Sequence, residues 1–82
     1  MSARVLYIDE MGALELDDTK VNLEEYEEAL KVDKEKGDRT PIEVHCPIFT
    51  SDKSPVGQVF QAILELSDRY DHPSHIMMGS SK

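Results

Sequence analysis

Two helix signals on either side of an alternating apolar segment constrain the fold of this chain more than any other feature. The first helix is predicted over residues 22–34, because Asn22 is a good N-cap and Glu25 completes a capping box. The second helix is predicted to follow Ser54, its N-cap, with Pro55 at the first position. In a chain of 82 residues both helices have to share one small core. The remaining apolar segments are therefore predicted to form a sheet against them.

Short segments rich in β-branched and aromatic residues predict the strands. The strongest covers residues 42–49, IEVHCPIF, in which every second side chain is apolar. Further strands are predicted over residues 4–8, 13–16 and 75–78. Pro47 cannot donate a ladder hydrogen bond, so we expect it at a sheet edge or a bulge.

The order of these elements, β-β-α-β-α-β, predicts the fold class. It is α+β, or a small α/β fold, built as a two-layer sandwich of a mixed four-stranded sheet and two main helices. Crossovers between parallel strands are right-handed in ~98% of cases. If both helices form such crossovers, the last three strands are parallel and the first is antiparallel to them. We expect a single domain over residues 1–82, with a frayed polar tail at residues 79–82.

Charge and cysteine content narrow the classes of partner. Nine Lys and Arg residues against 17 Asp and Glu residues give a formal net charge of −8. Nucleic acids and anionic membranes both require clustered basic residues, so neither is expected as a partner. Cys46 is the single cysteine and cannot form an intrachain disulfide, which favours a reducing, cytoplasmic location. The apolar run at the start of the chain is too short for a signal peptide.

Carboxylates and an amide follow two of the predicted strands and suggest a metal site. In the predicted topology these two connections leave the same edge of the sheet. Ca²⁺ takes about 6–8 oxygen ligands, mostly from carboxylates and carbonyls. The sequence therefore predicts a Ca²⁺ site, with Mg²⁺ as a substitute. The candidate ligands are Asp17, Asp18, Asn22, Glu25 and Asp52.

The alternative interpretation needs no metal, because acidic residues are common at helix N-termini and on solvated faces. The EF-hand pattern also fails, since Thr19, Val21 and Asn22 stand where it requires two ligands and a glycine. A rival acidic edge is predicted around Asp9, Glu10 and Asp71, where nearby lysines and arginines offer a metal-free explanation.

Zinc and enzyme signatures are weak in this sequence. His72 and His75 form a short pair and Cys46 adds a thiol, but a tetrahedral site needs four converging ligands. Cys46 shares its predicted face with apolar side chains, which would raise its pKa and suit a buried thiol better than a nucleophile. No G-x-S-x-G, H-E-x-x-H, P-loop or Rossmann glycine motif is present. We therefore expect a non-enzymatic protein.

The last predicted strand ends in Met77 and Met78. Flexible methionines are common at adaptable binding surfaces. If this strand lies at an edge, it can recruit a partner strand. The plainer interpretation is that both side chains fill the core.

The acidic stretch Asp17-Asp18-Thr19-Lys20-Val21-Asn22-Leu23-Glu24-Glu25, together with the lack of any enzyme signature, resembles small acidic proteins of unknown function from methanogenic archaea. The resemblance extends over the whole chain in size, acidity and element order. It implies an α+β fold with an acidic pocket suited to cations, and it assigns no role to any residue.

These observations predict a non-enzymatic acidic protein that binds a divalent cation, calcium first, through a carboxylate cluster. The alternative function is a protein–protein interaction module that presents an acidic surface to a basic partner.

Overall fold

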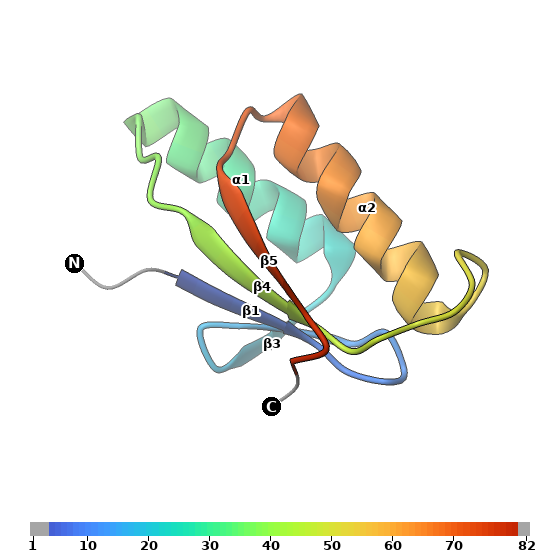
Figure 1. The fold of residues 1–82 in the computed structure, drawn as a ribbon. Coiled ribbons are helices and arrows are strands. Elements are labelled where there is room, and N and C mark those ends of the chain that lie inside the picture. Colours follow the sequence, from blue (N-terminus) through green and yellow to red (C-terminus); the bar gives the residue numbers. More distant parts are fainter. Residues whose placement is uncertain (1–3, 81–82) are drawn as a thin grey trace.

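A five-stranded mixed sheet carries both helices on one of its faces (Figure 1). The computed structural model describes residues 4–80. The elements are β1 (Arg4–Ile8), β2 (Leu14–Leu16), β3 (Thr19–Val21), α1 (Leu23–Lys36), β4 (Ile42–Cys46), α2 (Pro55–Arg69) and β5 (Ser74–Met78). The predicted fold class, an α+β two-layer sandwich with a mixed sheet and two helices, is confirmed. The sheet has five strands, one more than predicted.

The strand order is β3-β2-β1-β4-β5. β1 pairs antiparallel with β2, and β2 pairs antiparallel with β3. β4 pairs parallel with both β1 and β5. β1 is thus parallel to β4 and β5, so the expectation that the first strand runs antiparallel to all the other predicted strands is confirmed for β2 and wrong for β4 and β5.

The strand missing from the prediction is β3, and the turn before it explains the reversed directions. Leu16 pairs with Thr19 across a two-residue loop. Asp17 and Asp18 in this loop have φ values of 50° and 69°. Positive φ at both central residues is the pattern of a type I′ hairpin turn. The hairpin reverses the direction of the chain before α1 begins. The helices and strands that follow therefore run opposite to the predicted direction.

The first helix begins where the capping signal predicts. The Asn22 side chain accepts a hydrogen bond from the Glu25 N–H at 2.8 Å, and the Glu25 carboxylate accepts one from the Asn22 N–H at 3.0 Å. At its end, Gly37 has φ 72° and donates its N–H to the Lys34 carbonyl at 3.1 Å. The helix extends two residues beyond the predicted Lys34 because this glycine cap, rather than the apolar pattern, sets its end.

The second helix also begins at its predicted cap. The Ser54 hydroxyl accepts a hydrogen bond from the Gly57 N–H at 3.0 Å, and Pro55 occupies the first helical position. Gly57 is required here, because a Cβ atom at this position would collide with the Ser51 carbonyl oxygen. The loop after β4 is therefore packed closely against the start of α2.

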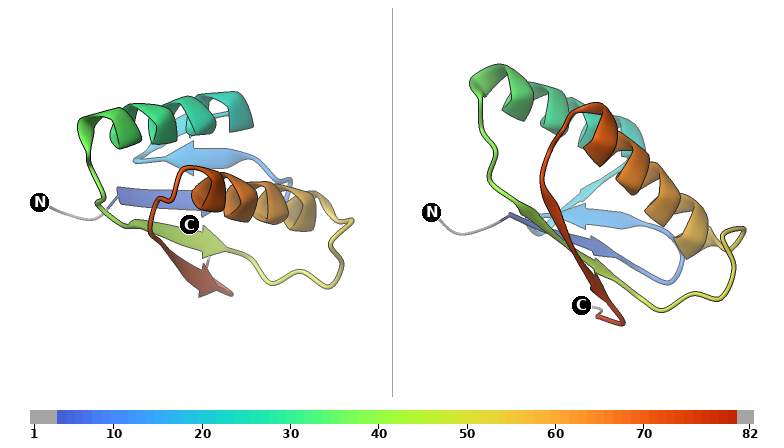
Figure 2. Two further views of the ribbon diagram at one scale, coloured as in Figure 1. Left: turned by 90° about the horizontal axis from the view of Figure 1, so that it is seen from above. Right: turned by 45° about the horizontal axis from the view of Figure 1, so that its top comes forward.

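The core lies between the sheet and the two helices. From the sheet, alternate residues such as Leu6, Ile8 and Val44 face the helices and are fully buried. Tyr26 from α1 and Ile63 from α2 close this layer. α1 contacts β3 and α2 contacts β1. Seen from above in Figure 2, β5 lies outside both helices at the edge of the sheet.

Within residues 4–80, the other face of the sheet carries no helix (Figure 1). Tyr7 and His45, neighbours in the register of β1 and β4, stack here with ring centroids 4.7 Å apart. His45 Nδ1 lies 2.6 Å from the Ser80 hydroxyl, and the Gly79 N–H donates to the Cys46 carbonyl at 2.8 Å. Gly79 and Ser80 are thus held by the sheet, contrary to the expected frayed tail. Residues 81–82 of that tail lie outside the described residues.

Candidate functional site

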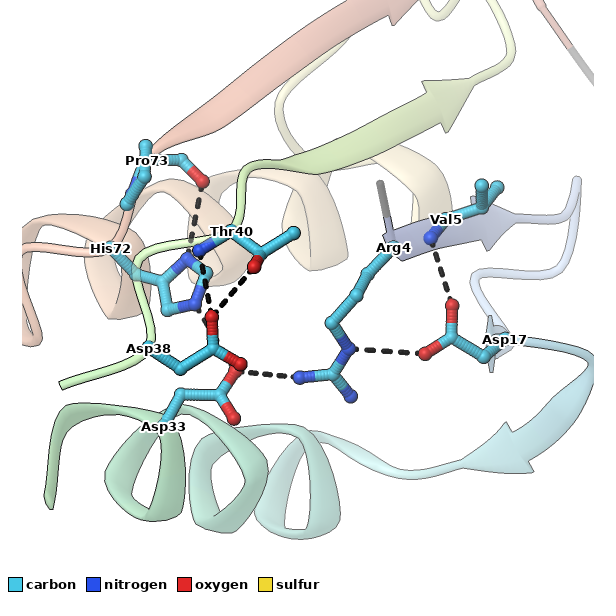
Figure 3. Close-up of polar contacts among 8 residues, drawn as sticks. All are labelled: Arg4, Val5, Asp17, Asp33, Asp38, Thr40, His72 and Pro73. Atoms are coloured by element: carbon cyan, nitrogen blue, oxygen red, sulfur yellow. Dashed lines mark hydrogen bonds and ion pairs between the residues drawn. The ribbon is translucent and has the colours of Figure 1, made fainter. Parts of the chain in front are cut away.

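The first two predicted calcium ligands lie in the hairpin turn between β2 and β3. The Asp17 carboxylate accepts hydrogen bonds from Arg4 Nε and from the Val5 N–H, both at 3.0 Å. Figure 3 shows this carboxylate turned toward the start of β1. Asp18 lies next to it in the turn. Both residues are therefore at the end of the sheet where β1 begins.

The remaining predicted ligands are elsewhere. Asn22 and Glu25 direct their side chains to each other's backbone in the capping box of α1. Asp52 lies in the loop after β4, at the end of the sheet where β1 finishes. Within residues 4–80, no group of three or more His, Cys, Asp or Glu residues is placed to hold a metal ion. The structure does not bring the five predicted ligands together.

The rival acidic edge is also divided between the two ends of the sheet. Asp9 follows β1, and its carboxylate accepts hydrogen bonds from the N–H groups of Met11 at 2.8 Å and Ala13 at 2.9 Å. Asp71 precedes β5 and lies at the opposite end, 2.9 Å from Arg39 Nη2. The hydrogen bond and charge of Arg39 lower the pKa of Asp71. Asp9 and Glu10 therefore lie at the same end of the sheet as Asp52, whereas Asp71 lies at the same end as Asp17. The unpredicted hairpin accounts for this exchange between the two predicted groups.

A buried charge network ties α1 to β1 and to the segment before β5 (Figure 3). Asp33 and His72 are only 8% and 6% exposed. Asp33 Oδ2 lies 2.6 Å from Arg4 Nη1 and 3.2 Å from His72 Nε2. The other ring nitrogen of His72 lies 3.1 Å from the Pro73 carbonyl oxygen. The basic partner of Asp33 is thus Arg4, which is 29 residues away in the sequence.

Asp38 lies beside this network and is held by one residue. Its carboxylate accepts from the Thr40 N–H at 2.9 Å and from the Thr40 hydroxyl at 2.6 Å. These hydrogen bonds lower the pKa of Asp38. The partners of Asp33 and Asp38 both come from within the fold. The cluster that they form with Arg4 and His72 is therefore suited to stabilising the fold rather than to binding a ligand.

Cys46 and the two histidines of the weak zinc hypothesis are far apart in the fold. Cys46 is fully buried at the end of β4, where burial raises the pKa of its thiol. His72 is buried before β5 begins, at the opposite end of the sheet. His75 is exposed and its strand position faces away from the helices. A buried thiol with a raised pKa is a poor nucleophile.

A groove of about 600 Å³ lies beside the tip of the β1–β2 hairpin, at the end of the sheet opposite the charge network. Its size is within the usual range of ligand pockets, about 300–1,000 Å³. It is lined by Tyr7, Ile8, Asp9, Glu10, Met11, Ala13, Leu14, Glu15, Lys20, Val21 and Pro47. By strand alternation, the side chains of Tyr7, Glu15 and Lys20 belong to the face of the sheet that carries no helix.

The lining of the groove combines an excess of acid with an apolar surface. Asp9, Glu10 and Glu15 contribute three carboxylates against the single ammonium group of Lys20. Met11, which is 81% exposed, extends the apolar lining to the tip of the hairpin.

A smaller hollow of about 300 Å³ adjoins the groove and shares Glu10 and Pro47 with it. Ile48, on its lining, is 76% exposed. The apolar surface therefore continues from the hairpin tip onto the loop after β4. The sequence identified the acids at this tip, but not the apolar residues that the fold places beside them from other segments.

Neither helix of the described chain is long and apolar enough to cross a membrane. No family model, curated protein or solved structure matches this chain. The resemblance to acidic archaeal proteins stays a prediction, and the geometry of the groove is the basis for proposing a function.

Proposed function

We propose that this protein is a non-enzymatic interaction module whose groove at the β1–β2 hairpin binds an extended basic segment of a protein partner. The observation that carries the proposal is the lining of the groove, where three carboxylates and one lysine surround an apolar surface. The alternative function predicted from the sequence, an acidic surface for a basic partner, is here assigned to a defined place.

The chemistry of Lys and Arg side chains fits both parts of this lining. Their aliphatic stems pack on apolar surface while their charged ends stay near water or a counter-ion. In the groove, the stems would lie on Tyr7, Met11 and Pro47, and the charged ends would reach Asp9, Glu10 and Glu15. The overall charge of −8 would speed the encounter with a basic partner over longer range.

The test uses a fluorescently labelled peptide in which Lys alternates with Leu, titrated with the protein and followed by anisotropy. We expect saturable binding that weakens as salt is added, because charge attraction is screened. The same peptide with Glu in place of every Lys is expected not to bind. A salt-independent affinity, or equal binding of the Glu peptide, would contradict the proposal.

Two charge-reversal variants locate the site. Glu10 lies on the groove and is exposed, whereas Glu65 is exposed on α2, in the other layer. Glu10→Lys and Glu65→Lys change the net charge of the protein equally. We expect Glu10→Lys to weaken binding about tenfold, which corresponds to ~1.4 kcal/mol, and Glu65→Lys to change it much less. Equal loss in both variants would mean that net charge alone attracts the peptide.

Divalent cation binding, the first function predicted from the sequence, is tested separately. ¹H–¹⁵N spectra are recorded while CaCl₂ or MgCl₂ is added. A calcium site would give saturable shifts in residues 17–25 and 50–53, or around Asp9 and Asp71. If the protein is instead an interaction module, we expect a chelator to leave peptide binding unchanged.

A further inference from the structure

One row of side chains crosses the sheet beside the groove, on the face that carries no helix within residues 4–80 (Figure 1). Lys20 pairs with Glu15 in the register of β3 and β2, and Glu15 pairs with Tyr7 in that of β2 and β1. Tyr7 pairs in turn with His45 across β1 and β4. Because β1 lies between β2 and β4, Tyr7 has Glu15 on one side and His45 on the other.

The stacking of Tyr7 on His45 determines which face of the Tyr7 ring is turned toward the groove. The two ring centroids are 4.7 Å apart, with 29° between the ring planes. Neighbouring strands are also ~4.8 Å apart, so the rings stack across the strands. One face of the Tyr7 ring therefore lies against His45, and the opposite face is turned toward β2 and Glu15. Of these described residues, Tyr7 and Glu15 line the groove and His45 does not, so the groove lies on this second side.

The fold holds both the ring and the hairpin tip in place. His45 Nδ1 lies 2.6 Å from the Ser80 hydroxyl, which fixes the ring on which Tyr7 stacks. At the tip of the hairpin, a Cβ atom on Gly12 would lie 2.9 Å from the Pro55 carbonyl oxygen, so the tip packs directly against the start of α2. A groove with a fixed lining loses little conformational entropy when it binds a partner.

We propose that the groove selects arginine over lysine in the basic segment that it binds, through the face of the Tyr7 ring turned toward Glu15. This inference rests on the proposed function and names the residue type that the same site recognises. The guanidinium group stacks on the ring, and its N–H groups donate to the Glu15 carboxylate on the neighbouring strand. Asp9 and Glu10 remain for the other basic residues of the segment.

A guanidinium group suits a ring beside a carboxylate better than an ammonium group does. It is planar and weakly hydrated, it stacks on aromatic rings, and its N–H donors form a fork that fits a carboxylate. The ammonium group of lysine is a strongly hydrated point charge, which the carboxylates attract but which gains less from the ring. A neutral aromatic side chain would also cover the ring, but it would bury the Glu15 carboxylate without a counter-charge. The excess of three carboxylates over Lys20 therefore favours arginine.

The test compares two labelled peptides of equal length and charge, the Lys–Leu peptide and one with Arg in place of every Lys. We expect the Arg peptide to bind the unaltered protein about fivefold more tightly in the anisotropy titration, as a partly exposed cation–π contact would give. Equal affinities would overturn this inference and leave the proposed function standing. If neither peptide binds, the proposed function fails and this inference fails with it.

Two substitutions of Tyr7 separate the effect of the ring from a general preference of acidic surfaces for arginine. Tyr7→Phe keeps the ring, and we expect it to keep the preference for the Arg peptide. Tyr7→Leu removes the ring but still offers apolar surface to a lysine stem. We expect it to reduce the preference to less than about twofold while the affinity for the Lys–Leu peptide changes little. An undiminished preference in Tyr7→Leu, or its loss in Tyr7→Phe, would overturn the inference.

A measurement on the unaltered protein decides the question even if Tyr7→Leu fails to fold. In the complex saturated with the Arg peptide, we expect nuclear Overhauser effects between the δ protons of an arginine and the ring protons of Tyr7. Their absence from the saturated complex would show that the guanidinium group does not stack on this ring, and would overturn the inference.

Discussion

At the scale of single residues, the contact between Asp33 and His72 shows how burial determines the role of a charge. The two groups are nearly inaccessible, and Arg4 supplies the counter-charge. His72 faces an acceptor at each ring nitrogen, the Asp33 carboxylate and the Pro73 carbonyl. A neutral imidazole can donate to only one of them. Both ring nitrogens of His72 therefore lie against groups of the fold itself, which makes this histidine part of the buried network.

Removing the charge of Asp33 is expected to destabilise the fold strongly. Asp33→Asn leaves Arg4 without its closest counter-ion, and breaking a buried pair typically costs ~3 kcal/mol in the free energy of unfolding. Urea unfolding measures this loss. The control is Asp71→Asn, which breaks an exposed pair with Arg39 and is expected to change stability little. Equal effects of the two substitutions would contradict the structural role of the network.

Burial also predicts a loss of stability at high pH. Desolvation raises the pKa of Tyr26 to about 12 from its ordinary value of 10.0. Between these values the unfolded chain ionises this phenol and the folded one does not, so stability is retained below pH 10 and falls toward pH 12. The two pKa values correspond to a loss of ~3 kcal/mol. Denaturant unfolding at several pH values measures this loss of stability. We expect the loss in the Tyr26→Phe variant to be smaller by about the same amount. An identical alkaline loss in both proteins would contradict the prediction.

At the scale of elements, local signals predicted the helices, while a short hairpin was missed. Both N-caps, Asn22 and Ser54, were predicted because a cap depends on a few adjacent side chains. β3 was missed because it has three residues, of which two are exposed, and so lacks an apolar pattern. The Asp17-Asp18 turn was the available signal, since Asp tolerates positive φ. Because β3 was missing from the prediction, the predicted topology placed Asp17 and Asp52 at the same end of the sheet.

The close packing of the loop after β4 against α2 predicts a difference between two glycines. Gly57→Ala places a Cβ against the backbone of Ser51 and is expected to cost ~3 kcal/mol, as overpacking does. Gly37→Ala meets no atom within 4 Å and bears only the strain of φ 72°, about 1–2 kcal/mol. Thermal unfolding of both variants checks the order. A Gly57→Ala protein as stable as Gly37→Ala would show that the loop is not packed as described.

At the scale of the whole molecule, placing both helices on one face leaves the other face, one edge and one hairpin tip available for contacts. Composition predicted an acidic protein, because the excess of Asp and Glu over Lys and Arg follows directly from counting residues. Composition could not predict which acids meet apolar surface, because Tyr7, Glu15 and Pro47 come from separate strands and loops. The groove therefore arises from the topology of the fold. The acidic residues alone predicted only a surface for a basic partner, without a location.

The location of peptide binding tests this account most directly. ¹H–¹⁵N spectra of the labelled protein are recorded as the Lys–Leu peptide is added. We predict that the largest shifts fall on residues 7–15, on Lys20 and on residues neighbouring Pro47, with little change around Arg4 and Asp33. Shifts spread evenly over the acidic surface, or centred on the helices, would contradict a binding site in the groove.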